Sequence, residues 1–398
     1  MTPSPAIPNV PETDPTQPQL PQDTPDIDFN PDTSVSSGFG AASGPSSSTP
    51  GMLGDSYITG AHVNYTLNTG ESFSATIPYG GRYKCADNTG PVPTDRVSFA
   101  YKHFHNALDQ ISTDATGGMT PQSSTGHIDM YTLGLEKSFM DQLFSVEFRM
   151  PFYGGGVFQD PFANNGGSFL ESPNVGNLSV ILKTLFTRND RLAIGGGLGI
   201  DFPTSENSSG QALNLQSIDY ENDAMYLAPF IAFLATPSED TWVQGVLQFS
   251  FVANQGNGLF TPANAGGGGG GGGGDIGLNF REQDLVFLTV NAGRWLYREP
   301  SRGWFTGIAA MAELNYSATL DETNVTSATS GNLTVSMANF ANHQDIINLT
   351  LGLHVQVTEL TNMRISAVAP LTGGGDKIGL QRDRYFDSEV SVQVNRNF

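Results

Sequence analysis

Apolar and polar residues alternate strictly along several short stretches of the chain. From 347 to 358, Ile, Leu and Val occupy every odd position, while Asn, Thr, Gly, His and Gln occupy the even ones. The same alternation recurs, less strictly, at 144–152, 243–251 and 389–398. Because successive side chains of a β-strand point to opposite faces, each stretch predicts a strand with one apolar and one polar face.

The number of such stretches predicts a barrel. Two more carry small residues on the second face, and weaker candidates complete the set; these lie at 192–200, 307–316, 97–104, 128–138, 178–186, 226–235, 285–297 and 362–369. About twelve strands of about 9–11 residues have the length that crosses a bilayer at a tilt. Since lipid meets one face of such a strand and a watery lumen meets the other, we predict an all-β fold: a transmembrane antiparallel up-and-down β-barrel of about 12 strands over 95–398.

The connections between these strands support a bacterial outer-membrane barrel. Such barrels alternate short periplasmic turns with long outer loops. Short connections are expected at 137–143, 188–191, 237–241, 298–303 and 359–362. Long ones are expected at 106–126, 154–177, 203–224, 253–275, 319–342 and 371–385. An even strand number predicts that the N- and C-termini both lie on the periplasmic side.

Aromatic residues are expected at both ends of the strands, as interfacial girdles require. Those near short turns are Phe139, Phe144, Phe186, Trp242, Trp295, Tyr297 and Trp304, and those near long loops are Phe152, Phe202, Tyr226, Phe251 and Tyr316. The last strand ends in Phe398, which resembles the C-terminal signal of bacterial outer-membrane proteins. The resemblance implies recognition by the barrel-assembly machinery through strand pairing.

The N-terminal part of the chain has a different composition. Residues 1–54 are rich in Pro, Ser and Thr and contain no Lys or Arg, so we expect a disordered tail, either a passive spacer or a tether to the cell wall or a partner. Within 55–94, two weakly alternating runs flank Asn68-Thr69-Gly70 and predict a small hairpin. We expect it at the periplasmic mouth, as a partial plug or a docking element. No secretion signal begins the sequence, so we expect a mature form.

Composition and charge exclude several classes of protein. The net charge is −21, and charged residues make up 14% of the chain. This argues against nucleic-acid binding, which needs clustered Lys and Arg, and against docking on anionic lipid through basic residues. The single cysteine, Cys85, excludes an intramolecular disulfide. No apolar run approaches the ~18 residues of a membrane helix.

Two motifs carry a more specific resemblance. They are Gly90-Pro91-Val92-Pro93-Thr94-Asp95-Arg96-Val97-Ser98-Phe99-Ala100-Tyr101 and Leu135-Glu136-Lys137-Ser138-Phe139. They resemble segments of the outer-membrane barrels of planctomycete-type bacteria, similar to the putative transporter family named for phenol-degradation pathways. The resemblance covers about 82–152 and implies a barrel with a transport role, but it supplies no site residues.

Charged and polar side chains on the second face of the strands are the candidates for lining a lumen. They are Lys102, Glu136, Glu147, Arg149, Lys183, Gln244, Gln248, Glu313, His354, Arg364 and Glu389. Rings of such charges tune pores. We therefore expect a Gram-negative, porin-like channel for passive diffusion of small hydrophilic solutes. The alternative is a closed structural or adhesive barrel with acidic surface loops, in which these side chains pair and fill the lumen.

The sequence offers little for catalysis or cofactor binding. A barrel phospholipase would need Ser and His within reach of each other, and no serine follows a histidine by two residues on one strand face, so we predict no enzyme and no cofactor. Asp219, Glu221 and Asp223 are weak candidates for Ca²⁺ because no complete loop motif surrounds them. The glycine run at 266–274 lacks the Lys-Ser/Thr of a phosphate-binding loop and predicts a flexible insert.

Overall fold

A computed structural model describes residues 49–56, 60–70, 72–78, 81–113, 122–155, 158–159, 168–170, 175–212, 216–254, 256–261, 276–322, 325–331, 333–338, 344–373 and 384–398. Within these ranges every regular element is a β-strand. None of the described residues forms a helix long and apolar enough to cross a membrane.

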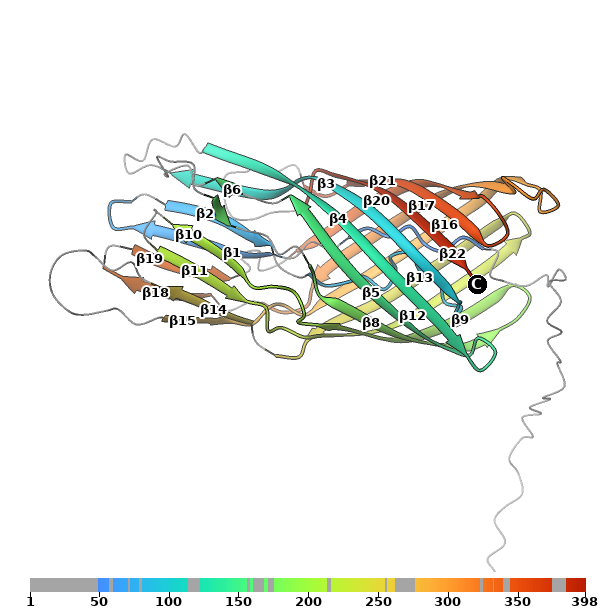
Figure 1. Cartoon of the computed structure of the whole chain (residues 1–398), viewed down its shortest axis with the longest axis horizontal. Helices are drawn as coiled ribbons and strands as arrows, with labels where there is room; N and C mark the ends of the chain where they lie inside the picture. Colours follow the sequence, from blue (N-terminus) through green and yellow to red (C-terminus); the bar gives the residue numbers. More distant parts are fainter. Residues whose placement is uncertain are drawn as a thin grey trace, which may run out of the picture. The chain divides into compact units, whose positions relative to one another are not determined.

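Twelve strands form a closed antiparallel barrel (Figure 1). They are β3 (Arg96–Thr113), β4 (Gln122–Phe139), β5 (Phe144–Gly155), β8 (Leu178–Arg188), β9 (Leu192–Phe202), β12 (Tyr226–Ser238), β13 (Thr241–Val252), β16 (Leu285–Arg298), β17 (Gly307–Thr319), β20 (Asp345–Gln356), β21 (Thr361–Pro370) and β22 (Ser388–Asn397). The barrel closes because β3 pairs with both β4 and β22. The predicted twelve-strand antiparallel barrel is confirmed.

Short and long connections lie at opposite ends of the barrel, in the predicted alternation. The β4–β5 turn is one of the short ones. Its Met140, Asp141 and Gln142 all adopt left-handed backbone angles, with φ between 51° and 68°. We call this end of the barrel the turn end and the other the loop end.

The long connections contain further strands rather than irregular loops alone. A six-stranded sheet at the loop end comprises β6 (Phe158–Gln159), β7 (Ser168–Leu170), β10 (Ser208–Ala212), β11 (Gln216–Glu221), β14 (Gly256–Thr261) and β15 (Ile276–Phe280). A second group, β1 (Gly60–Leu67), β2 (Ser72–Pro78), β18 (Thr326–Ser330) and β19 (Leu333–Ala338), extends the barrel sheet itself. β22 pairs with β3 only as far as His105, and β2 pairs with the end of β3 beyond that point. This pairing covers a strand edge that would otherwise be exposed.

The β1–β2 hairpin forms around Asn68-Thr69-Gly70, as predicted, but its position differs from the expected one. Ser72 of β2 pairs with Thr113 at the far end of β3, and β1 pairs with β19. The hairpin therefore lies at the loop end and not at the mouth formed by the short turns. The predicted tail falls mostly on 1–48, outside the described residues.

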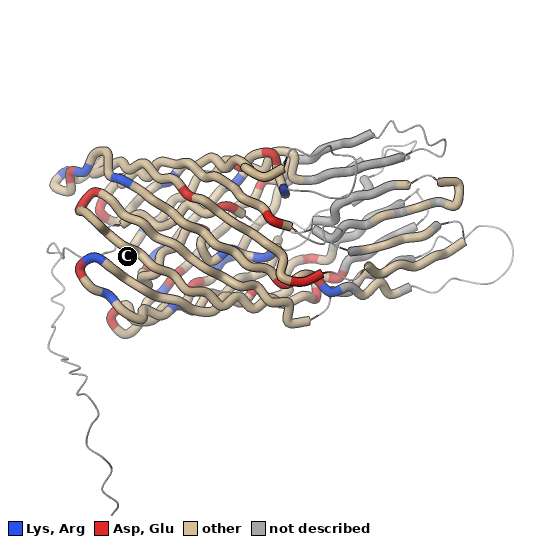
Figure 2. Tube along the Cα trace, turned by 180° about the vertical axis from the view of Figure 1, so that it is seen from behind, with Lys and Arg blue, Asp and Glu red and all other residues tan. Residues whose placement is uncertain are grey.

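The strands turn their apolar face outward and their polar face inward, in the registers predicted from alternation. In β20, Leu351 and Leu353 are about half exposed, whereas Thr350 and His354 are buried. Figure 2 shows charged positions gathered at the turns and where the barrel strands reach the loop end. An apolar exterior around a polar interior is the distribution that a transmembrane barrel needs.

Three aromatic residues do not belong to the predicted girdles. Phe139, Phe144, Phe186 and Trp304 are exposed at the turn end, but Trp242, Trp295 and Tyr226 are buried inside the barrel. Trp242 shares the face of the inward Gln244, and its indole N–H donates to Asn291. Alternation along β13 and β16 therefore determines the orientation of these tryptophans, despite their position near strand ends.

Candidate functional site: a plugged lumen

Two irregular segments, 49–56 and 81–95, occupy the barrel lumen; together we call them the plug. Met52, Leu53 and Asp55 are fully buried, and residues 81–89 are buried throughout. The first segment contacts Gln244 near the turn end and then Glu389 near the loop end. The second runs back from the loop end to the start of β3. The chain thus passes through the lumen twice before the barrel begins.

Side chains of the barrel wall bind the backbone of the first segment. Glu313 accepts hydrogen bonds from the backbone N–H groups of Leu53 and Gly54, the latter at 2.8 Å. The Arg364 guanidinium donates to the Met52 carbonyl at 2.7 Å, and Gln393 donates to the Leu53 carbonyl at 2.7 Å. These bonds satisfy backbone groups that have no strand partner and would otherwise be buried unpaired.

The second segment is held in the same manner. Gln248 accepts from the Cys85 backbone N–H at 2.6 Å and donates to the Tyr83 carbonyl at 2.9 Å. Asp201 accepts from the Tyr83 backbone N–H at 3.1 Å. Lys183 donates to the Thr89 hydroxyl at 3.0 Å. Every one of these wall residues projects inward from a barrel strand.

Buried ion pairs join the plug to itself and to the wall. Lys84 lies 2.6 Å from Asp55, which links the two plug segments. Lys102 of β3 lies 2.9 Å from Asp87 of the plug and 3.4 Å from Glu389 of the wall. Removing one partner from such a pair leaves an uncompensated buried charge, which costs about 3–5 kcal/mol.

A cluster of five charges lies in the wall near the turn end. Glu136 contacts Arg96 at 2.8 Å and Lys183 at 2.7 Å. Glu147 contacts Arg96, Arg149 and Lys183 at 2.9–3.2 Å. Three cations therefore share two carboxylates, and the local balance is positive by one charge.

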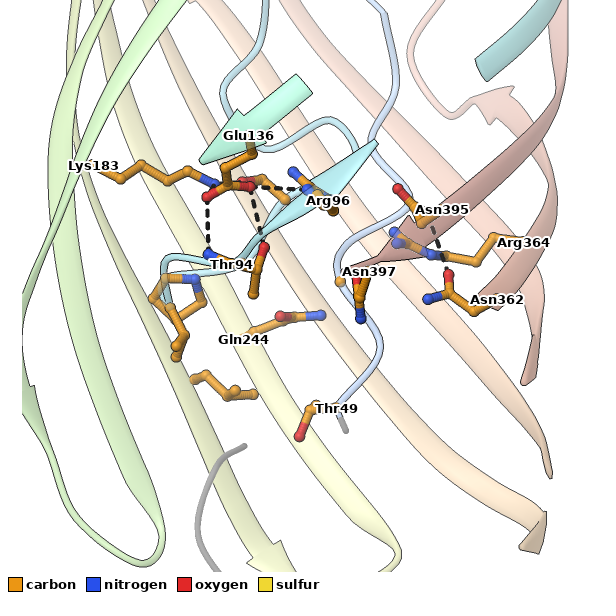
Figure 3. Close-up of a pocket in the computed structure, with 16 residues that line it drawn as sticks. Thr49, Thr94, Arg96, Glu136, Lys183, Gln244, Asn362, Arg364, Asn395 and Asn397 are labelled. Carbon is orange, nitrogen blue, oxygen red and sulfur yellow. Dashed lines mark hydrogen bonds and ion pairs between the residues drawn. The ribbon is translucent and has the colours of Figure 1, made fainter. Parts of the chain in front are cut away.

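A cavity of about 70 Å³ lies beside this cluster (Figure 3). Thr94, Glu136, Lys183, Gln244 and Arg364 are among its lining residues, and both plug segments contribute to it. Its volume accommodates several water molecules. Within the described part of the chain no carboxylate forms an ion pair with Arg364, and its buried Nε has no hydrogen-bond partner. The cavity thus borders a cation that no carboxylate contacts directly.

All eleven side chains predicted to line a lumen are buried inside the barrel. The structure brings Glu136, Glu147, Arg149 and Lys183 into the charge cluster, pairs Lys102 with Glu389, and uses Gln244, Gln248, Glu313 and Arg364 to hold the plug. His354 lies against Trp295 instead, with ring centroids 5.4 Å apart.

The set of predicted lumen-lining residues omitted several inward residues with the same periodicity. They are Arg96, Asp201, Asn291, Asn315, Asn348, Ser366, Gln393 and Asn395. Arg96 and Asp201 lie one residue beyond the predicted strands, whereas the other six already lie on the polar face of predicted strands. The plug had no such signal, because its segments do not alternate and many of its contacts are made by backbone groups.

The predicted calcium ligands and the predicted assembly signal are not among the residues that line the lumen cavity. The Asp219 side chain falls outside the described residues, and Glu221 and Asp223 lie around the end of β11. Phe398 is exposed; its N–H donates to the Asp95 carbonyl, and Lys137 lies over its ring. Although partial burial would raise the pKa of the Asp95 carboxyl, hydrogen bonds from Lys137 and Ser138 hold that pKa below its usual value.

Comparison with solved structures yields several barrels at low sequence identity. An outer membrane channel from Pseudomonas putida F1 aligns with a TM-score of 0.47 and 10% identity, over 80% of this chain and 100% of that one. The NanC porin aligns with 0.38 and 8%, over 76% and 98%. The Pseudomonas putida toluene transporter TodX aligns with 0.37 and 10%, over 86% and 90%.

No known protein family matches the chain, and no curated protein matches its sequence. The resemblance to the phenol-pathway transporter family therefore stays a prediction. The fold described above rests on the strand pairings of this chain.

Proposed function

We propose that this chain is a porin-like outer-membrane channel for passive diffusion of small hydrophilic solutes, and that the plug closes it in the state described here. The observation that carries the proposal is a lumen filled by a separate segment of chain. A barrel of about eight strands is filled by its own wall side chains, whereas these twelve strands enclose room for two further passes of backbone.

The type of contact supports opening. Within the described residues, 49–56 and 81–95 form no strand pairs with the barrel wall. Side-chain hydrogen bonds and the Lys102–Asp87 ion pair hold them instead. Each hydrogen bond contributes about 0.5–1.5 kcal/mol net, or about 1.5–3 kcal/mol where one partner is charged, because water replaces the lost partner. Water that enters the lumen can therefore replace the contacts between plug and wall one at a time, while the twelve-strand barrel stays intact.

The same proposal assigns the partners. Outer-membrane lipid would contact the apolar exterior, and the barrel-assembly machinery would recognise the β22 strand that ends at Phe398. Both chain ends would lie in the periplasm, where the N-terminal tail could reach the cell wall. The proposal includes no catalytic step.

A redox-controlled lock tests whether the plug gates the lumen. A Cβ built at Gly199 of β9 would lie 3.2 Å from the Sγ of Cys85 in the plug. That separation is close to what a disulfide imposes between one Cβ and the partner sulfur. Gly199→Cys should therefore cross-link plug to wall under oxidising conditions. Gly199→Ser adds nearly the same bulk without the bond and is the matched control.

Conductance in planar bilayers gives the readout. We expect channel openings from the unmodified protein, from Gly199→Ser and from reduced Gly199→Cys, and their loss on oxidation of Gly199→Cys. If the folded, unmodified protein shows no openings at any voltage, the channel proposal is contradicted and the closed structural barrel is favoured. The paired charges in the lumen are the observation that supports this alternative. Openings that survive the cross-link would show that solutes bypass the plug.

A further inference from the structure

Three histidines gather on the outer surface of the barrel, away from the lumen. His103 and His105 belong to β3, and His127 belongs to the neighbouring β4. One ring nitrogen from each lies within 4.8 Å of the other two. His105 and His127 are exposed, and their rings stack with centroids 4.6 Å apart.

Strand register and a bulge produce this arrangement. Lys102 and Phe104 point inward, so His103 and His105 share the outward face of β3. His103 pairs with Asp129, two residues from His127 on the same face of β4. The register then shifts between Phe104 and Leu108, and Asn106 takes a left-handed φ of 52°. Such a bulge redirects side chains locally, here next to the third histidine.

An acidic neighbour orients one of the rings. The Nδ1 of His103 lies 2.8 Å from an Asp129 carboxylate oxygen, which also accepts from the Tyr101 hydroxyl at 2.9 Å. A carboxylate that binds one imidazole nitrogen fixes the tautomer and leaves the other nitrogen as a metal ligand. The His103 Nε2 is therefore the nitrogen available to an ion.

The other two rings are free to adjust. His127 Nδ1 accepts a 3.3 Å hydrogen bond from the Asn106 backbone N–H, a long bond at an exposed position that water can replace. Among the described residues, none forms a hydrogen bond with the ring of His105 that would have to break. Zinc–imidazole bonds are about 2.0–2.1 Å long, so the nitrogens must converge by rotation of these exposed side chains.

We propose that His103, His105 and His127 bind one divalent transition-metal ion, with water in the remaining positions and Asp129 orienting His103. Imidazole ligands suit Zn²⁺, Ni²⁺ and Cu²⁺, whereas Ca²⁺ and Mg²⁺ prefer oxygen. The site lies on the outward face beyond the Tyr101–Tyr131 ring contact, so the ion would bridge β3 and β4 at the loop end. This site is independent of the proposed channel.

Calorimetric titration of the full, tag-free chain with Zn²⁺ tests the site. We expect saturable binding of one equivalent, and its loss in both His105→Ala and His127→Ala. Asp129→Asn should weaken binding by about 10–100-fold, as removal of an orienting carboxylate typically does. Tyr131→Phe changes an exposed neighbour without touching the imidazoles and should bind normally.

Titration of the same protein with Cu²⁺ gives a readout that needs no variant. Its electron paramagnetic resonance spectrum should show coupling to imidazole nitrogens. Absence of a one-equivalent step, a copper spectrum without nitrogen coupling, or zinc binding unchanged in both alanine variants would overturn the proposal.

Discussion

The Nζ atom of Lys183 lies 2.7 Å from Oε1 of Glu136, fully buried in the barrel wall. Lys183 also contacts Glu147, so one ammonium group neutralises parts of two carboxylates. The stability of the wall near the turn end therefore depends on a charge that solvent does not screen.

Lys183→Glu should prevent correct assembly. It places a third carboxylate beside Glu136 and Glu147, and loss of a buried ion-pair partner alone costs about 3–5 kcal/mol. The measurement is the fraction of heat-modifiable, folded barrel after refolding. Arg281→Glu, at an exposed pair with Asp284, is the control and should cost at most about 1 kcal/mol. Equal yields from the two variants would contradict the buried cluster.

Leu351→Arg should impair insertion by about 2–4 kcal/mol, because it places a charge on the lipid face near the middle of β20. Leu296→Arg is the matched control. Leu296 is also exposed on the outside but lies near the turn end, where the cost falls to about 0–1 kcal/mol. Urea titration of both variants in lipid bilayers measures the difference. Equal costs would place the bilayer elsewhere on the barrel.

Arg364→Met should shift ion selectivity toward cations. Arg364 borders the cavity without a carboxylate partner, so its charge acts on ions that enter there. The measurement is the reversal potential under a KCl gradient at low salt, where screening is weakest. Arg364→Lys keeps the charge and should keep the selectivity. An unchanged reversal potential in Arg364→Met would exclude the cavity from the ion path.

Deletion of Phe398 should reduce the amount of folded barrel in membranes without altering the barrels that do fold. The residue lies at the seam, where β22 closes against β3, and its exposed ring is available to the assembly machinery. Phe398→Tyr preserves the aromatic terminus and should assemble normally. Heat-modifiable protein per cell is the readout, and full assembly after deletion would remove this role.

The barrel could be predicted from sequence because each strand repeats a two-residue period that lipid and lumen both enforce. Leu351 outward and Thr350 inward follow from one pattern, as do the buried Glu313 and Gln393. Trp242 shows that the period outweighs the preference of tryptophan for a membrane interface.

The plug could not be predicted in this way. Its residues are held through backbone groups, as Met52 is by Arg364, and such contacts leave no periodic trace. One local signal exists at Gly54, whose φ is +73° and whose missing Cβ would lie 2.6 Å from the Cα of Asp87. A glycine of this kind indicates close backbone approach, but the sequence does not reveal which segment approaches.

The position of the β1–β2 hairpin restricts how the plug can leave. The two plug segments are joined at the loop end by the β1–β2 hairpin, in which β2 pairs with β3 and β1 pairs with β19. If the plug left toward the turn end, β1 and β2 would have to lose their pairing with β19 and β3. The hairpin would then have to pass through the lumen. The plug therefore cannot leave toward the turn end while the β1–β2 hairpin stays paired with β3 and β19. Opening toward the turn end therefore requires both plug segments to rearrange inside the lumen.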